Sequence, residues 1–317
     1  MIMHRGDQAL VISALKSAAP YIRLYKGRTF VIKAGGGVFG ETALTRALIE
    51  QIGILHYLGV RVVLVHGGGP QLTEVSDALG VQTRMVQGRR ITDEKSIEVT
   101  SMVLSGLINT RILAMCRELD IAAVGISGVD AGVVQAHRRA PVKLEGSEEV
   151  VDYGLVGDID RIDTGPIRKL LDDGLMPVIS PLSADERGTL LNINADTVAA
   201  AIGAALSAEK LILCTGAPGI LERVEDPRSL ISFTDLAGLE RLREQGSMVE
   251  GMLPKARAIE NAIRGGVRRV HVVSYKAPEG ILGEVFTNEG TGTLIVADVK
   301  ALPAHEQGTP DGGGGQG

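Results

Sequence analysis

Residues 29–37 read TFVIKAGGG and residues 61–69 read RVVLVHGGG. In each stretch a run of apolar, β-branched residues, which is typical of a buried strand, ends in three consecutive glycines. Glycine lets backbone N–H groups approach an anion without a Cβ in the way, and the N-terminus of a following helix adds positive potential. Two such turns in one chain predict a site for phosphate or carboxylate groups, although chain geometry alone would explain either turn by itself.

Neither glycine turn fits the common nucleotide-binding motifs. Neither contains the pattern GxxxxGK[ST], which excludes a P-loop NTPase. Neither reads GxGxxG with an acidic residue at the end of the next strand, so the sequence disfavours NAD binding. The expected anion site must therefore be of another kind.

Apolar strands and helical segments alternate along most of the chain. Continuous apolar strands separated by helices predict an α/β fold with a parallel sheet covered on both faces. Residues 132–163 differ, because their charged, alternating runs predict a β-hairpin excursion over the site. Beyond the two opening strands, we expect strands at residues 122–126, 176–179, 210–214 and 269–273, and helices at residues 7–19, 42–58, 71–79, 97–119, 197–206 and 254–264.

The composition is that of a globular protein. Of 317 residues, 44 % are hydrophobic and 22 % are charged, which excludes a mainly disordered chain. A formal net charge of −5, 3 % aromatic residues and no Trp argue against nucleic-acid binding. No apolar run reaches roughly 18 residues and no signal peptide stands out, so we expect no membrane association and a cytoplasmic location. Cys116 and Cys214 lack metal-ligand spacing and predict core thiols in a reducing compartment.

Two lysines stand where a positive charge needs an explanation. Lys33 lies within the first apolar strand, directly before the glycines, and burying an ammonium is unfavourable unless it reaches an anion. Lys255 follows Pro254 at the start of a helix, where the helix dipole opposes a positive charge. Both positions favour a point charge aimed at a transferring phosphoryl group, although an ammonium that reaches solvent would also fit either position.

Three polar side chains, Asn192, Asn194 and Asp196, lie within five residues at the start of the helix expected over 197–206. A helix needs one N-cap, so the others are available to bind a substrate or to orient the two lysines. Arg90, in the segment GRRITD, can grip a carboxylate with two hydrogen bonds, and an ordinary surface arginine is the alternative. Together these side chains predict a substrate site beside the glycine turns.

The segments FVIKAGGG, VVLVHGGGPQL, GRRITD, LLNINADTVAAAIGAALSAEKLIL and EGMLPKARAIENAI occur in this order. Together they resemble the amino acid kinase superfamily, and within it the acetylglutamate kinases, over residues 15–297. The resemblance implies a three-layer αβα sandwich with a mostly parallel central sheet. It also implies that ATP phosphorylates the γ-carboxylate of N-acetyl-L-glutamate to an acyl phosphate in arginine biosynthesis, with Mg²⁺ supplied together with ATP and no metal ligand from the protein.

The resemblance implies a role for each matching residue. Lys33 and Lys255 would stabilise charge on the transferring phosphoryl group, and Asp196 would organise both lysines. The other expected residues would bind the two substrates. The substrate-binding set would be Gly68, Gly69, Arg90 and Asn192, with Arg90 on the α-carboxylate, and the phosphate- or nucleotide-binding set would be Gly35, Gly36, Thr215 and Gly216.

The same resemblance divides the chain into four parts. Residues 1–27 would be an N-terminal helix that acts as an oligomerisation arm, and residues 28–190 the lobe that holds the acyl amino acid. Residues 191–300 would be the ATP-binding lobe, followed by a disordered Gly-rich tail over residues 301–317. The implied partners are small-molecule substrates and further copies of the chain, as a dimer or as dimers joined into a hexamer by the N-terminal helices.

Two further segments bear on regulation. PYIRLYKGR and GEVFTNEGTGT resemble the arginine-inhibited acetylglutamate kinases. The resemblance implies an arginine effector site at Tyr21, Glu284 and Gly290, in which Glu284 could pair with the guanidinium. The alternative is an ordinary N-terminal helix that docks on the body of the protein.

Several residues depart from the family pattern. Gly216 stands where the family usually has Asp, Gly37 where Ser or Asn is usual, and Thr110 where Lys is usual, while Val129 alters a GKDG-like turn. These departures fall near the expected ligands and leave both lysines, Asp196 and Arg90 untouched.

Two other functions stay open from the sequence. One is a kinase for a related acyl amino acid, such as carrier-linked aminoadipate or glutamate, for which Arg138, Arg139 and Lys143 would form a basic docking surface. The other is a non-catalytic, arginine-sensing, kinase-like subunit, which the presence of both lysines argues against.

Overall fold

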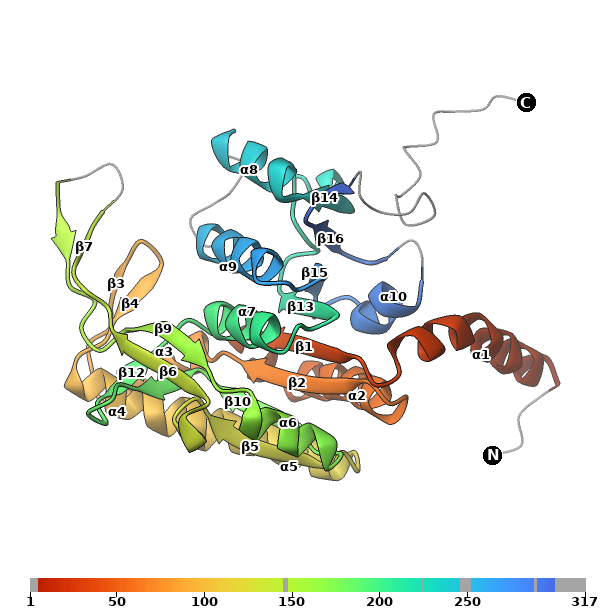
Figure 1. Cartoon of the computed structure of the whole chain (residues 1–317), viewed down its shortest axis with the longest axis horizontal. Helices are drawn as coiled ribbons and strands as arrows, with labels where there is room; N and C mark the ends of the chain where they lie inside the picture. The colour runs from red at the N-terminus through yellow and green to blue at the C-terminus, as the bar shows by residue number, and fades with distance from the viewer. Residues whose placement is uncertain (1–4, 145–147, 224, 246–251, 288–289, 300–317) are drawn as a thin grey trace.

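The structure, a computed structural model, describes residues 5–144, 148–223, 225–245, 252–287 and 290–299. An eight-stranded sheet runs through its centre (Figure 1). β1 (Thr29–Ala34) lies in the middle of this sheet, with β2 (Arg61–His66) on one side and β13 (Lys210–Thr215) on the other. The sheet continues from β2 through β10 (Met176–Ser180) to β5 (Ala123–Ser127), and from β13 through β15 (Arg269–Ser274) and β16 (Thr293–Val296) to β14 (Phe233–Asp235).

The pairing within this sheet is parallel except between β15 and β16. The mostly parallel sheet predicted from the sequence is therefore confirmed. The chain leaves β1 towards β2 and returns to its other edge at β13, so the strand order reverses at β1. Ligands of open α/β sheets bind beyond the carboxyl ends of the strands at such a point, which here is where the glycine turns lie.

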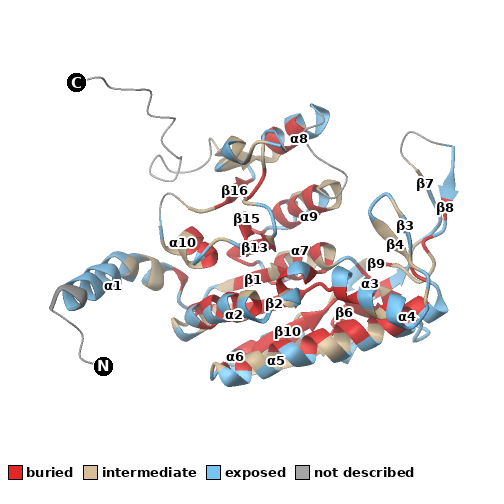
Figure 2. Cartoon of the chain, turned by 180° about the vertical axis from the view of Figure 1, so that it is seen from behind, coloured by how far each residue is buried: buried red, intermediate tan, exposed pale blue. Residues whose placement is uncertain are grey.

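Helices cover both faces of the sheet (Figure 1), and their buried sides face inward (Figure 2). The chain thus forms a three-layer αβα sandwich, as predicted. One face carries α6 (Gly165–Asp172), α7 (Ala195–Ala205), α8 (Leu236–Glu244) and α9 (Leu253–Arg264). The other carries α2 (Thr42–Tyr57), α3 (Gly69–Ala78), α4 (Glu94–Ser101), α5 (Asn109–Glu118) and α10 (Gly280–Phe286).

Short strands form the predicted excursion near the glycine turns. Residues 132–163 contain the antiparallel pair β6 (Val134–Arg138) and β9 (Gly157–Ile162), which confirms the expected hairpin. This pair extends into a four-stranded sheet with β11 (Leu182–Ala184) and β12 (Leu190–Asn192). Two further hairpins pair β3 (Arg84–Val86) with β4 (Arg89–Ile91), and β7 (Val142–Lys143) with β8 (Val150–Val151).

The helix predicted over residues 97–119 begins earlier than expected. The Asp93 side chain accepts the backbone N–H of Ser96, and this N-cap moves the start to Glu94. A π-helical segment, Met102–Ile108, joins α4 to α5.

The continuous helical stretch Glu94–Glu118 is, within the described residues, the one long and apolar enough to cross a membrane. Its residues Ile108 and Ile112 are buried in the core, which accounts for its hydropathy.

The N-terminal helix is longer than the sequence indicated. We expected residues 7–19, but α1 spans Arg5–Tyr25 with Pro20 inside it. Aromatic contacts hold its last turn, since Tyr21 packs on Phe286 and Tyr25 on Phe30. Most of α1 projects away from the sandwich (Figure 1). The predicted tail, residues 301–317, lies outside the described residues.

Candidate active site

β1 directs Lys33 towards the face of the sheet that α7 and α9 cover. Side chains alternate along a strand, and Phe30 and Ile32 are buried in the core on the α2 side. Val31 is buried in the core on the opposite side, together with residues of α7 and α9. Lys33 shares its face with Val31, and its ammonium therefore reaches the N-terminal ends of those two helices.

The three polar side chains of the segment NINAD, residues 192–196, make different contacts. Asn194 is the N-cap of α7, because its side-chain oxygen accepts the backbone N–H groups of Asp196 and Thr197. This leaves Asp196 free to point at the two lysines. Asn192 lies before the helix, at the end of β12, where its amide donates to Thr92 Oγ1 at 3.3 Å. The sequence prediction that one of the three caps the helix is confirmed.

Lys33, Asp196 and Lys255 form a buried ion triad. Lys33 Nζ lies 2.9 Å from Asp196 Oδ1, and Lys255 Nζ donates to Asp196 Oδ2 at 2.9 Å. The three side chains are 10–11 % exposed. The structure thus brings together the three residues that the sequence indicated as catalytic.

Burial alone would raise the pKa of Asp196, but the ammonium groups of Lys33 and Lys255 outweigh it and hold that pKa at about 2. Burial, together with the charge of Lys33, lowers the pKa of Lys255, while Asp196 opposes that shift. One carboxylate thus faces two ammonium groups. The triad carries an excess positive charge, which suits the phosphate groups of a substrate.

The two glycine turns touch each other beside this triad. A Cβ on Gly36 would lie 2.8 Å from Gly68 Cα and 2.9 Å from the backbone N of Gly69, which is closer than real Cβ contacts come. Gln71 Nε2 also donates to the carbonyl of Gly36 at 2.9 Å. Gly36 therefore allows a close approach between the 3₁₀ turn η1 (Gly36–Gly40) and the start of α3, where the first N–H groups lack intrahelical acceptors.

Arg90 and Asn192 line one cavity of about 280 Å³ between β4, β12 and α9. The guanidinium of Arg90 donates to Thr83 Oγ1 and to Thr73 Oγ1, and it makes no ion pair with an acid of the described residues. Burial lowers its pKa. The guanidinium of Arg90 can therefore still form an ion pair with a carboxylate, which is the role predicted for it from the sequence.

Three further arginines line the same cavity, and the sequence analysis assigned none of them to the substrate site. Arg89, Arg139 and Arg257 come from β4, from the end of β6 and from α9. The pKa of Arg89 is lowered first by burial and then by the charges of Arg139 and Arg257. Only Arg139 stood out in the sequence, and its guanidinium pairs with Asp158. The lining carries an excess of positive charge, because four arginines, two of them from β4, face one acid, Asp158.

The expected nucleotide residues Thr215 and Gly216 lie at the carboxyl end of β13, next to the first glycine turn. Gly35 N–H donates to the carbonyl of Cys214 at 3.4 Å, and Thr215 Oγ1 closes a tight turn with Ala217. Tyr275, which follows β15, is tied to the same place because its N–H donates to the carbonyl of Thr215. The sequence analysis did not single out Tyr275, since nothing in its local sequence distinguishes it.

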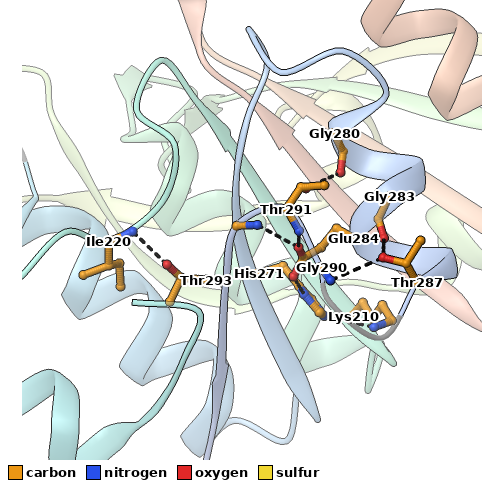
Figure 3. Close-up of polar contacts among 11 residues, drawn as sticks. Lys210, Ile220, His271, Gly280, Gly283, Glu284, Thr287, Gly290, Thr291 and Thr293 are labelled. Atoms are coloured by element: carbon orange, nitrogen blue, oxygen red, sulfur yellow. Dashed lines mark hydrogen bonds and ion pairs between the residues drawn. The ribbon is translucent and has the colours of Figure 1, made fainter. Parts of the chain in front are cut away.

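A second buried polar chain lies on the far side of the sheet from the cavity, under α10 (Figure 3). Lys210 Nζ lies 3.0 Å from His271 Nε2, and His271 Nδ1 lies 2.6 Å from Glu284 Oε1. Burial and the charge of Lys210 lower the pKa of His271 to about 4. The neutral imidazole therefore accepts from Lys210 and donates to Glu284.

The residues of the expected effector site surround this chain. Glu284 Oε2 accepts the N–H groups of Thr291 and Gly292, and a Cβ on Gly290 would lie 2.9 Å from the same oxygen. Burial would raise the pKa of Glu284, but the bonds from His271 and from the backbone outweigh it and bring the pKa to about 2. Tyr21 of α1 packs on Phe286, which lies in the same helix as Glu284.

Both cysteines are buried free thiols, as predicted. Burial raises the pKa of Cys116 to about 11 and that of Cys214 to about 12. Neither thiol is a nucleophile at neutral pH.

The site combines a buried triad with excess positive charge, two touching glycine turns at the switch point of the sheet and a cationic cavity beside them. These features define a phosphotransferase that acts by positioning its substrates. The chain belongs to the amino acid kinase family, whose profile matches residues 28–274.

Curated relatives agree with this assignment. The acetylglutamate kinase of Myxococcus xanthus is 45 % identical over 92 % of this chain and 96 % of its own length. That of Heliobacterium modesticaldum is 41 % identical over 89 % of this chain and 96 % of its own.

Solved structures share the fold. The N-acetylglutamate synthase of Neisseria gonorrhoeae superimposes with a TM-score of 0.78 at 28 % identity, over 90 % of this chain. This chain spans only 63 % of that synthase. The carbamate kinase of Giardia lamblia, with a TM-score of 0.60 at 19 % identity over 86 % of this chain and 99 % of its own, shares the fold.

Gly36→Ala should separate the two glycine turns. The added methyl would meet the backbone of the neighbouring turn, and a displacement of about 1 Å at a phosphoryl-transfer site lowers turnover on the order of 100-fold. Gly40→Ala in the same 3₁₀ turn is the matched control, since a Cβ there meets open space. Equal kcat values for the two variants would contradict the close approach.

Asp196 should make the stability of the protein depend on pH in acid. Its pKa is 3.8 in a model peptide and about 2 in the folded chain. The folded state therefore binds fewer protons, and the stability that this carboxylate contributes above pH 4 is lost as the pH falls towards 2. The loss amounts to about 2 kcal/mol. Urea unfolding of the wild type and of Asp196→Asn across this range should show a steeper fall for the wild type, and parallel curves would refute the charged triad.

Proposed function

We propose that this chain is an acetylglutamate kinase, which transfers the γ-phosphoryl group of ATP to the γ-carboxylate of N-acetyl-L-glutamate. The observation that carries the proposal is the ion triad of Lys33, Asp196 and Lys255 beside two touching glycine turns. Relatives 38–45 % identical to this chain, over about nine-tenths of its length, carry that name.

The acceptor would lie on the side of β2 and β10. Arg90 would hold the α-carboxylate, Asn192 would donate to the acylated amino acid, and the N–H groups of Gly68 and Gly69 would face its reacting carboxylate. The excess of arginines in the lining favours a substrate with carboxylates, because a guanidinium forms a charge-assisted, two-bond pair with a carboxylate.

The donor ATP would lie on the side of β13 and β15, above Gly35, Gly36, Thr215 and Gly216. This follows from in-line transfer, in which donor and acceptor approach the triad from opposite sides. Magnesium would neutralise part of the phosphate charge. ATP itself would carry the ion, because both oxygens of Asp196 face ammonium groups and the described residues contain no cluster of three acidic, His or Cys side chains.

In the reaction a γ-carboxylate oxygen attacks the γ-phosphorus while the bond to the bridging oxygen of ADP breaks. The carboxylate needs no general base, since it is ionised at neutral pH. Lys33 and Lys255 stabilise the charge that develops on the transferring group and on the leaving oxygen. Asp196 keeps both ammonium groups charged and fixed, so that the site does not reorganise during transfer.

We further propose that arginine inhibits the enzyme from the region of Tyr21, Glu284 and Gly290. The polar chain under α10 supports this proposal, because it places a carboxylate with a pKa of about 2 next to the turn at Gly290. Glu284 already accepts three hydrogen bonds, so a guanidinium would share its oxygens with the backbone. A similar N-acetylglutamate synthase, 27 % identical and with a TM-score of 0.78, was solved in complex with L-arginine.

The projecting helix α1 supports a homo-oligomer. Leu10 is 71 % exposed, Leu15 is 59 % exposed and Ile12 is 53 % exposed, an apolar surface that a second copy of the chain would cover. We propose that α1 helices of neighbouring subunits join dimers into a larger ring, and that the enzyme works in the cytoplasm.

The structure does not favour the carrier-linked alternative. Each member of the basic set suggested as a docking surface is already paired, Arg138 with Asp152, Arg139 with Asp158, and Lys143 with Glu148. These pairs leave less net positive charge on the hairpin than the sequence indicated.

The kinase proposal is tested by supplying the chain with ATP, Mg²⁺ and N-acetyl-L-glutamate. We expect ADP release that depends on N-acetyl-L-glutamate, with the acyl phosphate trapped by hydroxylamine as a hydroxamate. Added arginine should suppress turnover in the wild type and not in Glu284→Gln. No hydroxamate from folded protein would contradict the kinase, and turnover indifferent to arginine would remove the effector site alone.

Arg90→Ala should weaken the acceptor and not the donor. Loss of a charge-assisted pair of about 1.5–3 kcal/mol raises the KM for N-acetyl-L-glutamate roughly 10- to 100-fold. The KM for ATP should stay the same. Arg84→Ala, an exposed arginine of the same hairpin, is the control and should leave both constants unchanged. A similar rise in both KM values for Arg90→Ala would argue against the carboxylate contact.

Deletion of residues 1–20 should lower the mass of the oligomer while the sandwich stays folded. The truncation removes the exposed apolar residues of α1 and keeps Tyr21 and Tyr25, which pack on the body. Light scattering of the full chain and of the truncated chain measures this difference. An unchanged mass would contradict the proposed role of α1.

A further inference from the structure

Two of the glycines that depart from the family pattern, Gly37 and Gly216, face the same side chain. A Cβ at position 37 would overlap the hydroxyl of Tyr275, and a Cβ at position 216 would lie 3.1 Å from the same oxygen. The phenol therefore fills the space in which side chains at both positions would stand.

Tyr275 is held in this position from its backbone and from its ring. Its N–H donates to the carbonyl of Thr215 at 2.9 Å, and β13 and β15 pair in register up to Thr215 and Ser274. The ring is half-buried against the core on the α2 side of the sheet. The hydroxyl lies beside both turns and makes no hydrogen bond with any described residue.

The position of this hydroxyl relative to the triad indicates its ligand. Gly37 follows Lys33 by four residues on the turn after β1, and Gly216 directly follows β13. Arg90 and Asn192 lie outside the eight-stranded sheet, in β4 and β12. The phenol instead lies beside Thr215 and Gly216, where we place the phosphoryl donor, and this placement favours a phosphate oxygen as its ligand.

We propose that Tyr275 is a nucleotide-binding residue whose phenolic O–H donates a hydrogen bond to a phosphate oxygen of ATP, in the place left open by Gly37 and Gly216. This inference rests on the proposed kinase function and names a further residue of the same site. The phenolic O–H supplies a hydrogen-bond donor at this point.

The test compares the wild type with Tyr275→Phe, which keeps the ring and removes the hydroxyl. Calorimetric titration with the non-hydrolysable analogue AMP-PNP and Mg²⁺ should show about a tenfold weaker Kd for the variant. The KM for ATP should rise with it, and the KM for N-acetyl-L-glutamate should not change. Tyr57→Phe, which removes a hydroxyl on the distant helix α2, should bind AMP-PNP like the wild type.

A second comparison tests whether Tyr275 occupies the space of a side chain at position 37. Gly37→Ser alone should weaken AMP-PNP binding, because its side chain meets the phenol. Tyr275→Ala should also weaken it, and Gly37→Ser combined with Tyr275→Ala should bind more tightly than Tyr275→Ala alone, since the serine hydroxyl enters the vacated space.

The outcomes separate this inference from the function on which it rests. Equal Kd values for the wild type and Tyr275→Phe would overturn the role of Tyr275 and leave the kinase in place. A double variant that binds no better than Tyr275→Ala would overturn the exchange of side chains. A wild type that binds no AMP-PNP would overturn the proposed function itself and this assignment with it.

Discussion

The site depends on one buried carboxylate that faces two ammonium groups. Asp196 ties Lys33 of the central strand to Lys255 of a covering helix, and it thereby joins the sheet to α7 and α9 at one point. A buried charge is tolerated only when it is paired, so neither helix can move without exposing an unpaired lysine. Because one negative charge cannot neutralise two positive ones, the triad needs a further anion, and the phosphate groups of a substrate are suited to complete it.

Close packing of backbone is the second constraint. Gly36 and Gly68 bring two turns from neighbouring strands into contact beside the triad. Two other glycines, Gly37 and Gly216, leave space for a side chain instead, because the phenol of Tyr275 lies where their Cβ atoms would be close to it. Glycine therefore decides the shape of the site by where side chains are missing, while the lysines decide its charge.

The sequence predicted most of this fold, because buried strands and amphipathic helices each leave a periodic pattern. β1 was predicted at its observed bounds, and the ion triad was predicted from lysines whose positions made no sense without an anion. The predicted end of α1 was wrong, because contacts of Tyr21 with Phe286 and of Tyr25 with Phe30 hold the helix as far as Tyr25. Tyr275 and the arginines around Arg90 were missed, because residues from separate elements meet only in three dimensions and leave no local pattern. The lobe boundaries and the roles of the ligand-binding residues stay predictions.

The central claim is that Asp196 acts through the two lysines and not on its own. A double-mutant cycle of Lys33→Met and Asp196→Asn, with kcat measured from trapped hydroxamate, tests it most directly. If Asp196 works by fixing Lys33, each single variant loses most of kcat and the double variant loses little more than Lys33→Met alone. If the two losses in kcat multiply, the residues act independently and the triad is not the unit on which catalysis depends.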